Sequence, residues 1–391
     1  MRNQFDFKLQ TQTYYGFGYS RRLGQFLQER NFKNVVLLVH RGVSECSNYF
    51  QEIKSVVEGH IPSLRVEVLR GSEEPDYDYL DLVVEKIRSF KKIDAIVGIG
   101  GGSCLDIVKA VAVLITNPGK GVEYRGFDKV EVPGVPVIAI PTTAGTGSEI
   151  TGNAVFTNKE EQKKLGINGR YLNASYAILD AEWTLSCPFP VALSSGLDAL
   201  VHSMESFMCQ QANSLTRMFS KEGFRLIYSS LPCLVDDPEN QEKRQKLLLG
   251  SYMSAIGLFN SGSGVAGALS YPLGVHFKIP HGIAGGMLLL DVIDFNVNKG
   301  YFEFAEIYDL IEPGAGLSDK EKSLRFLEKL QELYNKLGVE KYLTPWGITE
   351  DNVAEVGKLM HPLQAAFDQN PVFCSAKEDA LNILKKHAQP S

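Results

Sequence analysis

Short apolar runs alternate with amphipathic segments along the first half of the chain. The apolar runs are rich in β-branched residues and have the length of buried parallel strands, which predicts strands at 35–39, 64–68, 95–99 and 135–140. Apolar residues at helical spacing predict intervening helices at 44–58, 77–91 and 105–114. Such alternation implies a doubly wound parallel sheet with right-handed crossover connections.

The pattern changes near Leu185. Beyond Pro188 the sequence is typical of long amphipathic or apolar helices rather than of alternating strands. The clearest of these predicted helices cover 194–211, 215–231, 242–260 and 320–337. We therefore expect two domains, a Rossmann-like α/β domain over residues 1–185 and an all-α domain over residues 186–391.

Composition and charge exclude several classes of function. The chain has 391 residues, of which 44% are hydrophobic, and its 40 basic and 46 acidic residues give a net charge of −6. Mild acidity argues against non-specific binding to nucleic acid or to an anionic membrane surface. The N-terminus has no signal-like apolar region, and the 6 cysteines form no C-x-x-C pair. We expect a cytoplasmic protein with reduced thiols and no membrane partner.

A glycine-rich turn follows the strand at 95–99 and opens the next helix. It contains four glycines, Gly98, Gly100, Gly101 and Gly102, and ends in Ser103. Glycines let the backbone approach a phosphate closely, and the helix N-terminus presents unpaired N–H groups to an anion. The pattern is neither a Walker loop nor a G-x-G-x-x-G fingerprint. It predicts a different phosphate cradle, with a tight strand–helix turn as the alternative.

A second loop of small residues covers 141–149, directly after the strand at 135–140. Its hydroxyls, on Thr142, Thr143, Thr146 and Ser148, can bond to phosphate or ribose groups. Gly/Ser/Thr loops without a ligand are also common. Two such loops at the carboxyl ends of strands in one parallel sheet favour a shared ligand crevice.

Asp198 and His202 are four residues apart in a segment that reads as a helix. Positions i and i+4 stack on one helix face, so both side chains can point at a common cation. The alternative for the pair alone is an ordinary exposed hydrogen bond.

Four motifs, taken together and in this order, resemble the iron-containing (group III) alcohol dehydrogenase family. They are Gly-Gly-Gly-Ser at 100–103, Pro-Thr-Thr-Ala-Gly-Thr-Gly-Ser-Glu at 141–149, Gly-Leu-Asp-Ala-Leu-x-His-Ser-x-Glu at 196–205 and Pro-His-Gly at 280–282. The match extends to Asn370-Pro371 and Glu378-Asp379. The resemblance implies a dinucleotide-binding domain, a helical metal-binding domain and a cleft between them. In that family a divalent metal holds the alcohol oxygen while hydride passes to or from a nicotinamide.

The resemblance also implies which residues contact the cofactor. These are Gly100, Gly101, Gly102, Ser103 and Asp106 in and after the first loop, Thr142, Thr143, Thr146 and Ser148 in the second, and Lys164. Where the family commonly has an acidic residue facing the adenosine ribose, this chain has His40-Arg41. A guanidinium pairs with a 2′-phosphate, so Arg41 favours NADP over NAD.

Asp198, His202 and His281 match three of the family's four metal ligands. The fourth ligand position is Gly267, and a family histidine associated with proton transfer falls at Tyr271. Three protein ligands still suffice for a catalytic zinc or non-haem iron site. Water, substrate or His276 are alternatives for the vacant position, and Tyr271 is a candidate proton relay.

The predicted function is a metal-dependent oxidoreductase, with iron or zinc, that interconverts a primary alcohol and an aldehyde using NAD or NADP. One alternative is a branch that oxidises the terminal hydroxyl of a 3-deoxy-octulosonate sugar acid in lipopolysaccharide biosynthesis, with oxygen as another candidate oxidant. A second is a catalytically inactive, nucleotide-binding assembly subunit, and a third is a non-redox lyase related to dehydroquinate synthase. The family resemblance implies a homodimer or larger assembly.

Overall fold

The computed structural model describes residues 4–70, 75–161, 163–342, 349–360 and 363–388. The chain forms two compact units, one spanning Leu9–Pro188 and the other formed by the chain from Phe189 onward. The segment that ends at Lys8 belongs to the second unit, whereas the sequence placed it in the first. The Lys8 N–H donates to the Asn260 side-chain oxygen at 2.6 Å, and the Asn260 amide donates back to the Lys8 carbonyl at 3.0 Å.

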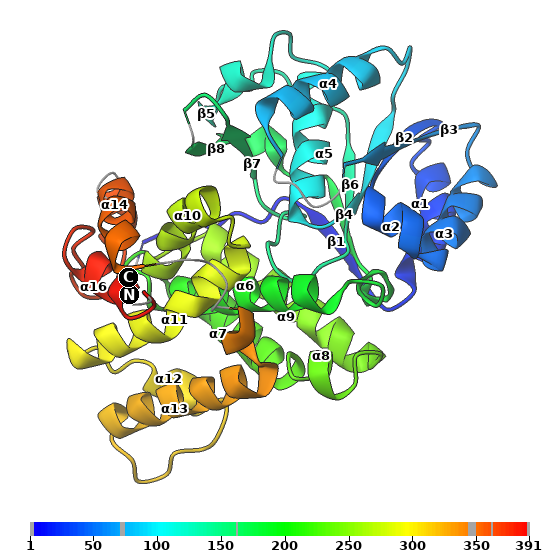
Figure 1. Cartoon of the computed structure of the whole chain (residues 1–391). Helices are drawn as coiled ribbons and strands as arrows, with labels where there is room; N and C mark the ends of the chain where they lie inside the picture. The colour runs from blue at the N-terminus through cyan, green and yellow to red at the C-terminus, as the bar shows by residue number, and fades with distance from the viewer. Residues whose placement is uncertain (1–3, 71–74, 162, 343–348, 361–362, 389–391) are drawn as a thin grey trace. The chain divides into compact units, whose positions relative to one another are not determined.

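A six-stranded sheet forms the centre of the first unit (Figure 1). In spatial order its strands are β1 (Gln12–Tyr15), β9 (Tyr176–Leu179), β6 (Val137–Pro141), β4 (Ala95–Gly100), β2 (Asn34–His40) and β3 (Ser63–Leu69). Every neighbouring pair is parallel. All four predicted strands lie in this sheet. The two strands that the sequence missed, β1 at one edge and β9 beside it, are only four residues long each.

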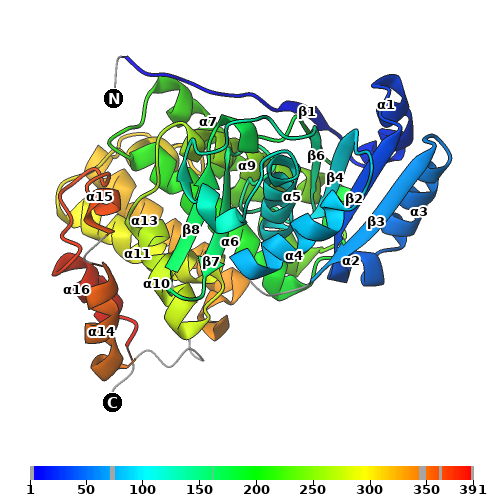
Figure 2. The same cartoon turned by 90° about the horizontal axis from the view of Figure 1, so that it is seen from above.

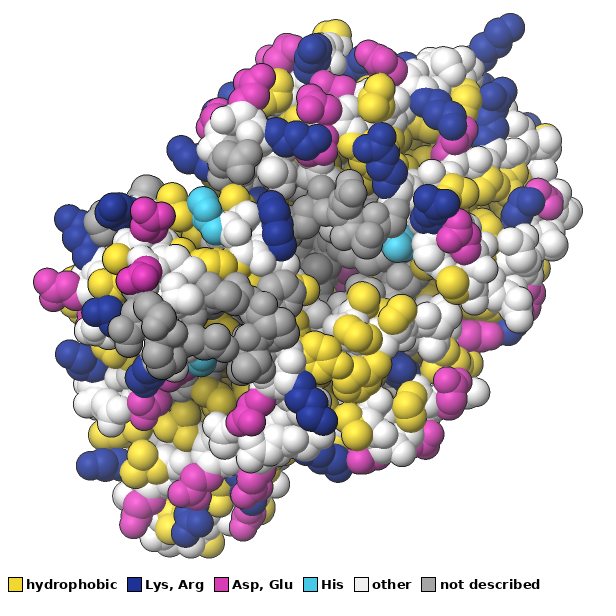
Figure 3. All heavy atoms as spheres, viewed as in Figure 1, with side chains coloured by type: hydrophobic (Ala, Val, Ile, Leu, Met, Phe, Trp, Pro, Cys, Tyr) yellow, Lys and Arg dark blue, Asp and Glu magenta, His cyan; other side chains and the backbone are white. Residues whose placement is uncertain are grey.

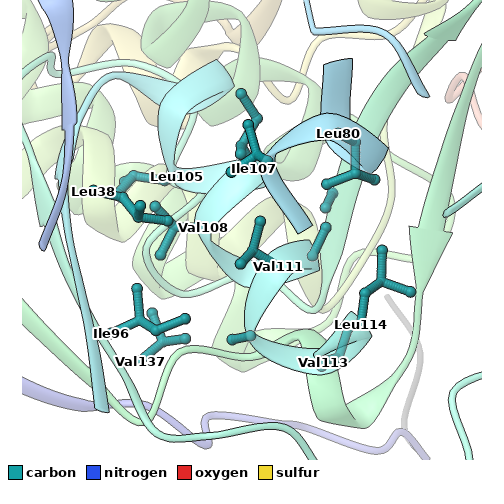
Figure 4. Packing of buried hydrophobic residues seen from close by; sticks show 14 of the residues in the cluster. Leu38, Leu80, Ile96, Leu105, Ile107, Val108, Val111, Val113, Leu114 and Val137 are labelled. Carbon is teal, nitrogen blue, oxygen red and sulfur yellow. The ribbon is translucent and has the colours of Figure 1, made fainter. Parts of the chain in front are cut away.

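Helices cover both faces of this sheet. Successive side chains of β2 point to opposite faces, and those on both faces are apolar, so both faces have to be covered. Val36 and Leu38 pack in the cluster formed with α4 (Tyr77–Arg88) and α5 (Gly102–Leu114). Figure 4 shows Leu38 beside Leu105 and Val108 of α5. The alternate β2 residues pack in the opposite cluster, with α1 (Leu23–Glu29) and α3 (Asn48–Glu58) (Figure 2).

Two local features of this unit differ from the sequence prediction. The expected helix at 44–58 is two helices, α2 (Arg41–Cys46) and α3, because Ser47 between them adopts an extended backbone conformation. A three-stranded sheet of β5 (Gly126–Phe127), β8 (Lys163–Asn168) and β7 (Asn153–Asn158) was missed altogether. Its strands are short and only partly buried, so they lack a strong apolar alternation.

The second unit is helical throughout its described residues. Its longer helices are α6 (Phe189–Met208), α7 (Ser214–Ser230), α9 (Gln241–Phe259), α10 (Val265–Phe277), α11 (His281–Asn298), α13 (Asp319–Leu337) and α14 (Glu350–Met360). Its short helices are α8 (Cys233–Asp236), α12 (Ala305–Tyr308), α15 (Gln364–Phe367) and α16 (Asp379–Lys385). The parallel α/β unit followed by a helical unit confirms the predicted fold class.

Helices α6, α10 and α11 pack against one another in the helical unit (Figure 2). The sequence did not predict α10 and α11 as separate helices. Both are apolar on most of their surface, which removes the one-sided pattern that marks an amphipathic helix. α10 ends at Phe277, where Lys278 adopts the left-handed conformation, and Pro280 is the N-cap at which α11 begins.

Later parts of the chain hold α11 along its length. Tyr334 of α13 donates to the Gly286 carbonyl at 2.7 Å, and Asn296 and Asn370 bond through their side-chain amides. Near the C-terminus, Lys386 and His387 contact the Asp291 carboxylate at 2.9 and 2.6 Å. Burial acts to raise the pKa of Asp291, but the hydrogen bonds from His387 and Lys386 outweigh it and lower that pKa overall.

The face of the molecule in Figure 3 carries Lys and Arg side chains interspersed with Asp and Glu. This mixture agrees with the small net charge of −6. Among the described residues, no helix has both the length and the apolar character that crossing a bilayer requires.

Candidate active site

The two predicted loops of the first unit lie against each other. β4 ends at Gly100 and α5 begins at Gly102, so Gly101 alone separates the strand from the helix. A Cβ on Gly102 would lie 2.6 Å from the Thr146 hydroxyl oxygen, and one on Gly101 would lie 3.2 Å from that of Thr143. The Thr142 N–H also donates to the Gly100 carbonyl at 3.0 Å. The glycines are therefore needed for the close contact of the two loops.

The start of α5 has the features of an anion-binding helix N-terminus. Its N-cap is Gly101, which provides no capping side chain, and Ser103 in the first turn is exposed. The helix continues for 13 residues, so its dipole adds to the attraction of the first-turn N–H groups for negative charge. This geometry suits the predicted phosphate contacts of Gly100, Gly101, Gly102 and Ser103.

Asp106 and Ser148 hold the second loop in place. The Ser148 hydroxyl donates to Asp106 at 2.5 Å, and the other Asp106 oxygen accepts from the Val155 N–H of β7 at 2.9 Å. Beneath them lies Lys109, which is fully buried and donates to the Ser148 carbonyl at 2.8 Å. The sequence reasoning missed Lys109, because a lysine within an apolar helix gives no sign that it binds a distant loop.

Glu149 is the next residue of the second loop and is only 2% exposed. Burial raises the pKa of its carboxyl from 4.5 to about 7, although its own backbone N–H and the Lys109 charge act in the opposite direction. The carboxyl is thus neutral below that pH in the folded chain. This titrating group was not anticipated from the sequence.

Arg41 and Lys164, the two other predicted cofactor contacts, are less buried than the loop residues described above. Arg41 is the first residue of α2 and is exposed, and its guanidinium donates to Glu45 at 2.8 Å, one helical turn onward. The preceding residue, His40, approaches the glycine turn, since its Cβ lies 3.1 Å from a Cβ built on Gly100. Lys164 lies in β8 opposite Thr157 of β7 and is half-buried.

In the helical unit, α6 carries three acid or imidazole side chains on one face. Asp198, His202 and Glu205 have i, i+4 and i+7 spacing, which places them along a single stripe of the helix. His202 Nε2 lies 3.4 Å from an Asp198 oxygen, and the Asp198 side chain is 7% exposed. Asp198 is buried and the His202 side chain is 12% exposed, so the pair is not an exposed hydrogen bond.

His281 reaches the same carboxylate from α11. Its Nε2 lies 3.8 Å from the same Asp198 oxygen, and its Nδ1 lies 2.8 Å from the hydroxyl of Ser270 on α10. The Tyr271 ring contacts the imidazole edge-on, with ring centroids 5.0 Å apart. Ser270 and Tyr271 thus orient the imidazole, and Ser270 was missed by the sequence reasoning.

The glycine of the Pro-His-Gly motif explains how α11 comes so close to α6. A Cβ on Gly282 would lie 1.9 Å from the Ser194 carbonyl oxygen and 2.9 Å from the Asp198 Cβ. Only glycine permits this approach. One turn on, Gly286 lies against Leu197 in the same way.

The donor chemistry around Asp198 fits a divalent metal. Two ligands at about 2.1 Å from a tetrahedral ion are about 3.4 Å apart. The two imidazole Nε2 atoms lie 3.4 and 3.8 Å from one carboxylate oxygen. Within the described part of the chain, no group of three or more His, Cys, Asp or Glu side chains lies close enough together to hold an ion. The fit therefore rests on the two pairs that share Asp198.

Gly267, at the position where the family resemblance predicts a fourth ligand, is the third residue of α10. His276 lies nine residues further along the same helix, which is about 13 Å at 1.5 Å per residue, and its side chain is exposed. His276 therefore cannot fill the space beside Gly267. That space holds Glu205 instead, since a Cβ on Gly267 would lie 2.7 Å from Glu205 Oε2.

Glu205 is fully buried, and the sequence reasoning gave it no role although it stands in the quoted α6 motif. One carboxylate oxygen accepts the Gly267 N–H at 2.8 Å. The other, Oε2, has no hydrogen-bond partner among the described residues. Burial raises the pKa of Glu205, against the lowering effect of nearby backbone N–H groups and His202.

Comparisons with known proteins agree with this geometry. Residues 10–181 match the family model of iron-containing alcohol dehydrogenases, and residues 192–388 match that of the C-terminal region of the Fe-containing alcohol dehydrogenase family. The chain belongs to the iron-containing alcohol dehydrogenase family. It is accordingly an enzyme of alcohol and aldehyde oxidoreduction.

Among similar proteins, the NAD-dependent methanol dehydrogenase of Bacillus methanolicus is 32% identical over 71% of this chain and 73% of its own length. The long-chain-alcohol dehydrogenase 1 of Geobacillus thermodenitrificans is 34% identical over 68% of each chain. A solved sulfoacetaldehyde reductase from Bifidobacterium kashiwanohense, in complex with NAD+, is 25% identical with a TM-score of 0.86 over 98% of both chains. These comparisons give no support to the sugar-acid or inactive-subunit alternatives.

The close contact at Gly282 yields a stability prediction. The variant Gly282→Ala places a methyl group against the Ser194 carbonyl and Asp198, and we expect it to destabilise the fold by about 1–3 kcal/mol or more. Gly285→Ala is the matched control on the same helix, because its Cβ would meet Val201 at an ordinary 3.5 Å. We expect the control to stay within about 1 kcal/mol of the parent. Urea unfolding measures both, and equal stabilities for the two variants would contradict the assignment.

The buried Glu149 predicts a pH dependence. Because its folded-state pKa is raised, its contribution to stability is complete below pH 4.5 and is lost as the pH rises through about 7. Glu149→Gln has no charge to lose over this pH range. Between pH 4.5 and about 7 the free energy of unfolding of the parent should therefore fall by about 3 kcal/mol relative to that of Glu149→Gln. Chemical unfolding at several pH values checks this. A difference between the two proteins that does not change with pH would refute it.

Proposed function

We propose that the protein is an NAD(H)- and metal-dependent dehydrogenase that interconverts a primary alcohol and its aldehyde. The observation that carries the proposal is the convergence of His202 and His281 on the single Asp198 oxygen, at 3.4 and 3.8 Å. Both imidazoles reach that oxygen from separate helices. Such an arrangement suits a shared cation better than a hydrogen bond of one pair.

Asp198, His202 and His281 would hold the metal. We propose iron on the strength of the family, with zinc as the other ion that this donor set suits. A bound divalent metal supplies Lewis-acid chemistry, which lowers the pKa of an alcohol and polarises a carbonyl oxygen. Ser270 holds the His281 ring, with its hydroxyl 2.8 Å from Nδ1 and 3.4 Å from Nε2.

Tyr271 is the side chain that we place for proton transfer. Its ring contacts His281 edge-on and is 37% exposed, so it lies beside the ligand set and also reaches solvent. A phenol can donate or accept a proton, although its ordinary pKa of about 10 suits the task less well than an imidazole does. Asp198 is buried, whereas the His281 side chain is 30% exposed, so the ligand set is open to solvent on the His281 side.

For the cofactor, we propose that the N–H groups at the start of α5 bind the pyrophosphate, with Thr143 and Thr146 beside Gly101 and Gly102. Asp106 and Ser148 brace this loop, and Lys164 is the remaining contact carried over from the family. When bound, a nicotinamide accepts or donates the hydride. We favour NAD, because one similar protein is named NAD-dependent and another was solved with NAD+.

The preference for NADP remains a prediction that rests on Arg41 alone. The Arg41 guanidinium already donates to Glu45 at 2.8 Å, which weakens its claim on a 2′-phosphate. A cytoplasmic location and a homodimer or larger assembly also remain expectations. Size-exclusion chromatography with light scattering measures the assembly directly.

The metal proposal predicts the effect of removing one ligand. Asp198→Asn keeps the side-chain shape but removes the charge that the two imidazoles share, so metal content and alcohol oxidation should both fall at least tenfold. Glu328→Gln, on an exposed face of α13, is the control and should match the parent. Elemental analysis and nicotinamide absorbance are the measurements. Full metal content in Asp198→Asn would count against the site.

The cofactor proposal predicts a preference. Calorimetric titration should show NAD+ binding more tightly than NADP+, and Gly102→Ala should weaken NAD+ binding at least tenfold because its methyl group meets Thr146. Arg41→Ala should leave NAD+ affinity within about twofold, since Arg41 pairs with Glu45. Tighter NADP+ binding that disappears in Arg41→Ala would restore the NADP assignment.

A further inference from the structure

We propose that Lys109 is a positioning residue for the cofactor, because its buried ammonium, together with Asp106, holds the second loop in the shape that binds NAD. This role rests on the nucleotide site proposed above. It makes Lys109, Asp106 and Ser148 the support of that site. The contacts with the cofactor are then left to Thr143 and Thr146.

The Lys109 side chain joins parts of the first unit that are far apart in the sequence. It is fully buried on α5 and donates to the backbone carbonyls of Ser148, Thr151 and Asn153 at 2.8, 3.2 and 2.5 Å. The first of these carbonyls belongs to the second loop, and the last belongs to the first residue of β7. One side chain thus ties the loop, and the strand that follows it, to the helix that the glycine turn opens.

These contacts need a charged side chain. Three carbonyl oxygens call for three N–H donors, which an ammonium has and a neutral amine lacks. Burial lowers the pKa of Lys109, and the Asp106 and Glu149 carboxyls act in the opposite direction. Asp106 Oδ1 lies 3.3 Å from Nζ, so the buried charge has a counter-ion. An apolar side chain at 109 would leave the three carbonyls without this donor.

Asp106 is engaged in the same network. One of its oxygens accepts the Ser148 hydroxyl at 2.5 Å, and the other accepts the Val155 N–H at 2.9 Å. Both carboxylate oxygens therefore have donors from the chain itself, and the buried Ser148 hydroxyl has used its one proton on Asp106. The family resemblance predicts both residues as cofactor contacts, whereas these bonds favour a supporting role for both.

Thr146 is the hydroxyl through which the support reaches the cofactor. It is exposed, and its oxygen would lie 2.6 Å from a Cβ on Gly102 at the start of α5. The Ser148 N–H donates to the same oxygen at 3.3 Å, while the Ser148 carbonyl accepts from Lys109. The ammonium therefore fixes Ser148 on one side, and Ser148 fixes Thr146 on the other.

The competing explanation is that Lys109 only stabilises the fold. Replacing such a residue lowers the free energy of unfolding, but the protein that remains folded binds NAD+ as the parent does. The proposed metal ligands belong to the other compact unit, so Co²⁺ affinity provides an independent measure of correctly folded protein. Comparing NAD+ affinity with Co²⁺ affinity in one variant therefore separates the two explanations.

The test titrates the full-length protein with NAD+ and, in its metal-free form, with Co²⁺, following the heat of binding. Lys109→Met keeps most of the stem but removes the charge and its donors. It should bind NAD+ at least tenfold more weakly than the parent, with Co²⁺ affinity within about twofold. Lys86→Met, on an exposed lysine of α4, is the matched control and should equal the parent in both titrations.

A second variant tests whether Asp106 acts through the same loop. Asp106→Asn replaces one acceptor oxygen by a donor and should also weaken NAD+ binding. If both residues act by holding the loop, the loss in the Lys109→Met/Asp106→Asn double variant is smaller than the product of the two single losses. Losses that simply multiply would place Asp106 in separate contact with the cofactor and overturn the shared role.

Two further results would overturn the positioning role of Lys109. One is NAD+ affinity within twofold of the parent in Lys109→Met, and the other is a parallel loss of NAD+ and Co²⁺ binding in that variant. Both leave the proposed nucleotide site of the parent intact. If the parent itself binds no NAD+, the cofactor site of the proposed function fails, and the role of Lys109 with it.

Discussion

The approach of two helices to one carboxylate is the constraint on which the helical unit depends. His202 is on the same helix as Asp198, but His281 reaches Asp198 only because α11 begins almost in contact with α6. That contact requires a residue without a side chain at 282. The distance between imidazole and carboxylate is therefore set by backbone packing, and the motif Pro-His-Gly records the requirement in the sequence.

The nucleotide side of the chain uses the same principle. Glycines at 101 and 102 allow the second loop to lie directly against the start of α5, with the hydroxyls of Thr143 and Thr146 at the contact. A buried lysine and aspartate then fix that loop from beneath. In both units the residues that we propose to bind cofactor or metal are carried on backbone held in place by glycine contacts and by polar groups behind them.

The sequence predicted most of the six-stranded sheet, but it missed the short strands. Strong β-branched runs mark β2 and β4, whereas β1 and β9 are short and β7 and β8 are half polar. Helix spacing brought Asp198 and His202 together without further information, but His281 came only from the family resemblance, because no local pattern links positions so far apart. Lys109 and Glu205 could not be anticipated, since their roles depend on what surrounds them after folding.

The links along α11 have a consequence for the order in which the protein assembles. This helix carries His281 at its first residue, yet its partners are Tyr334, Asn370 and finally Lys386 and His387. Lys386 and His387 follow α11 in the chain, so α11 is synthesised before these partners are. The contacts that hold α11, and with it His281, therefore depend on residues that are synthesised after the whole of the first unit.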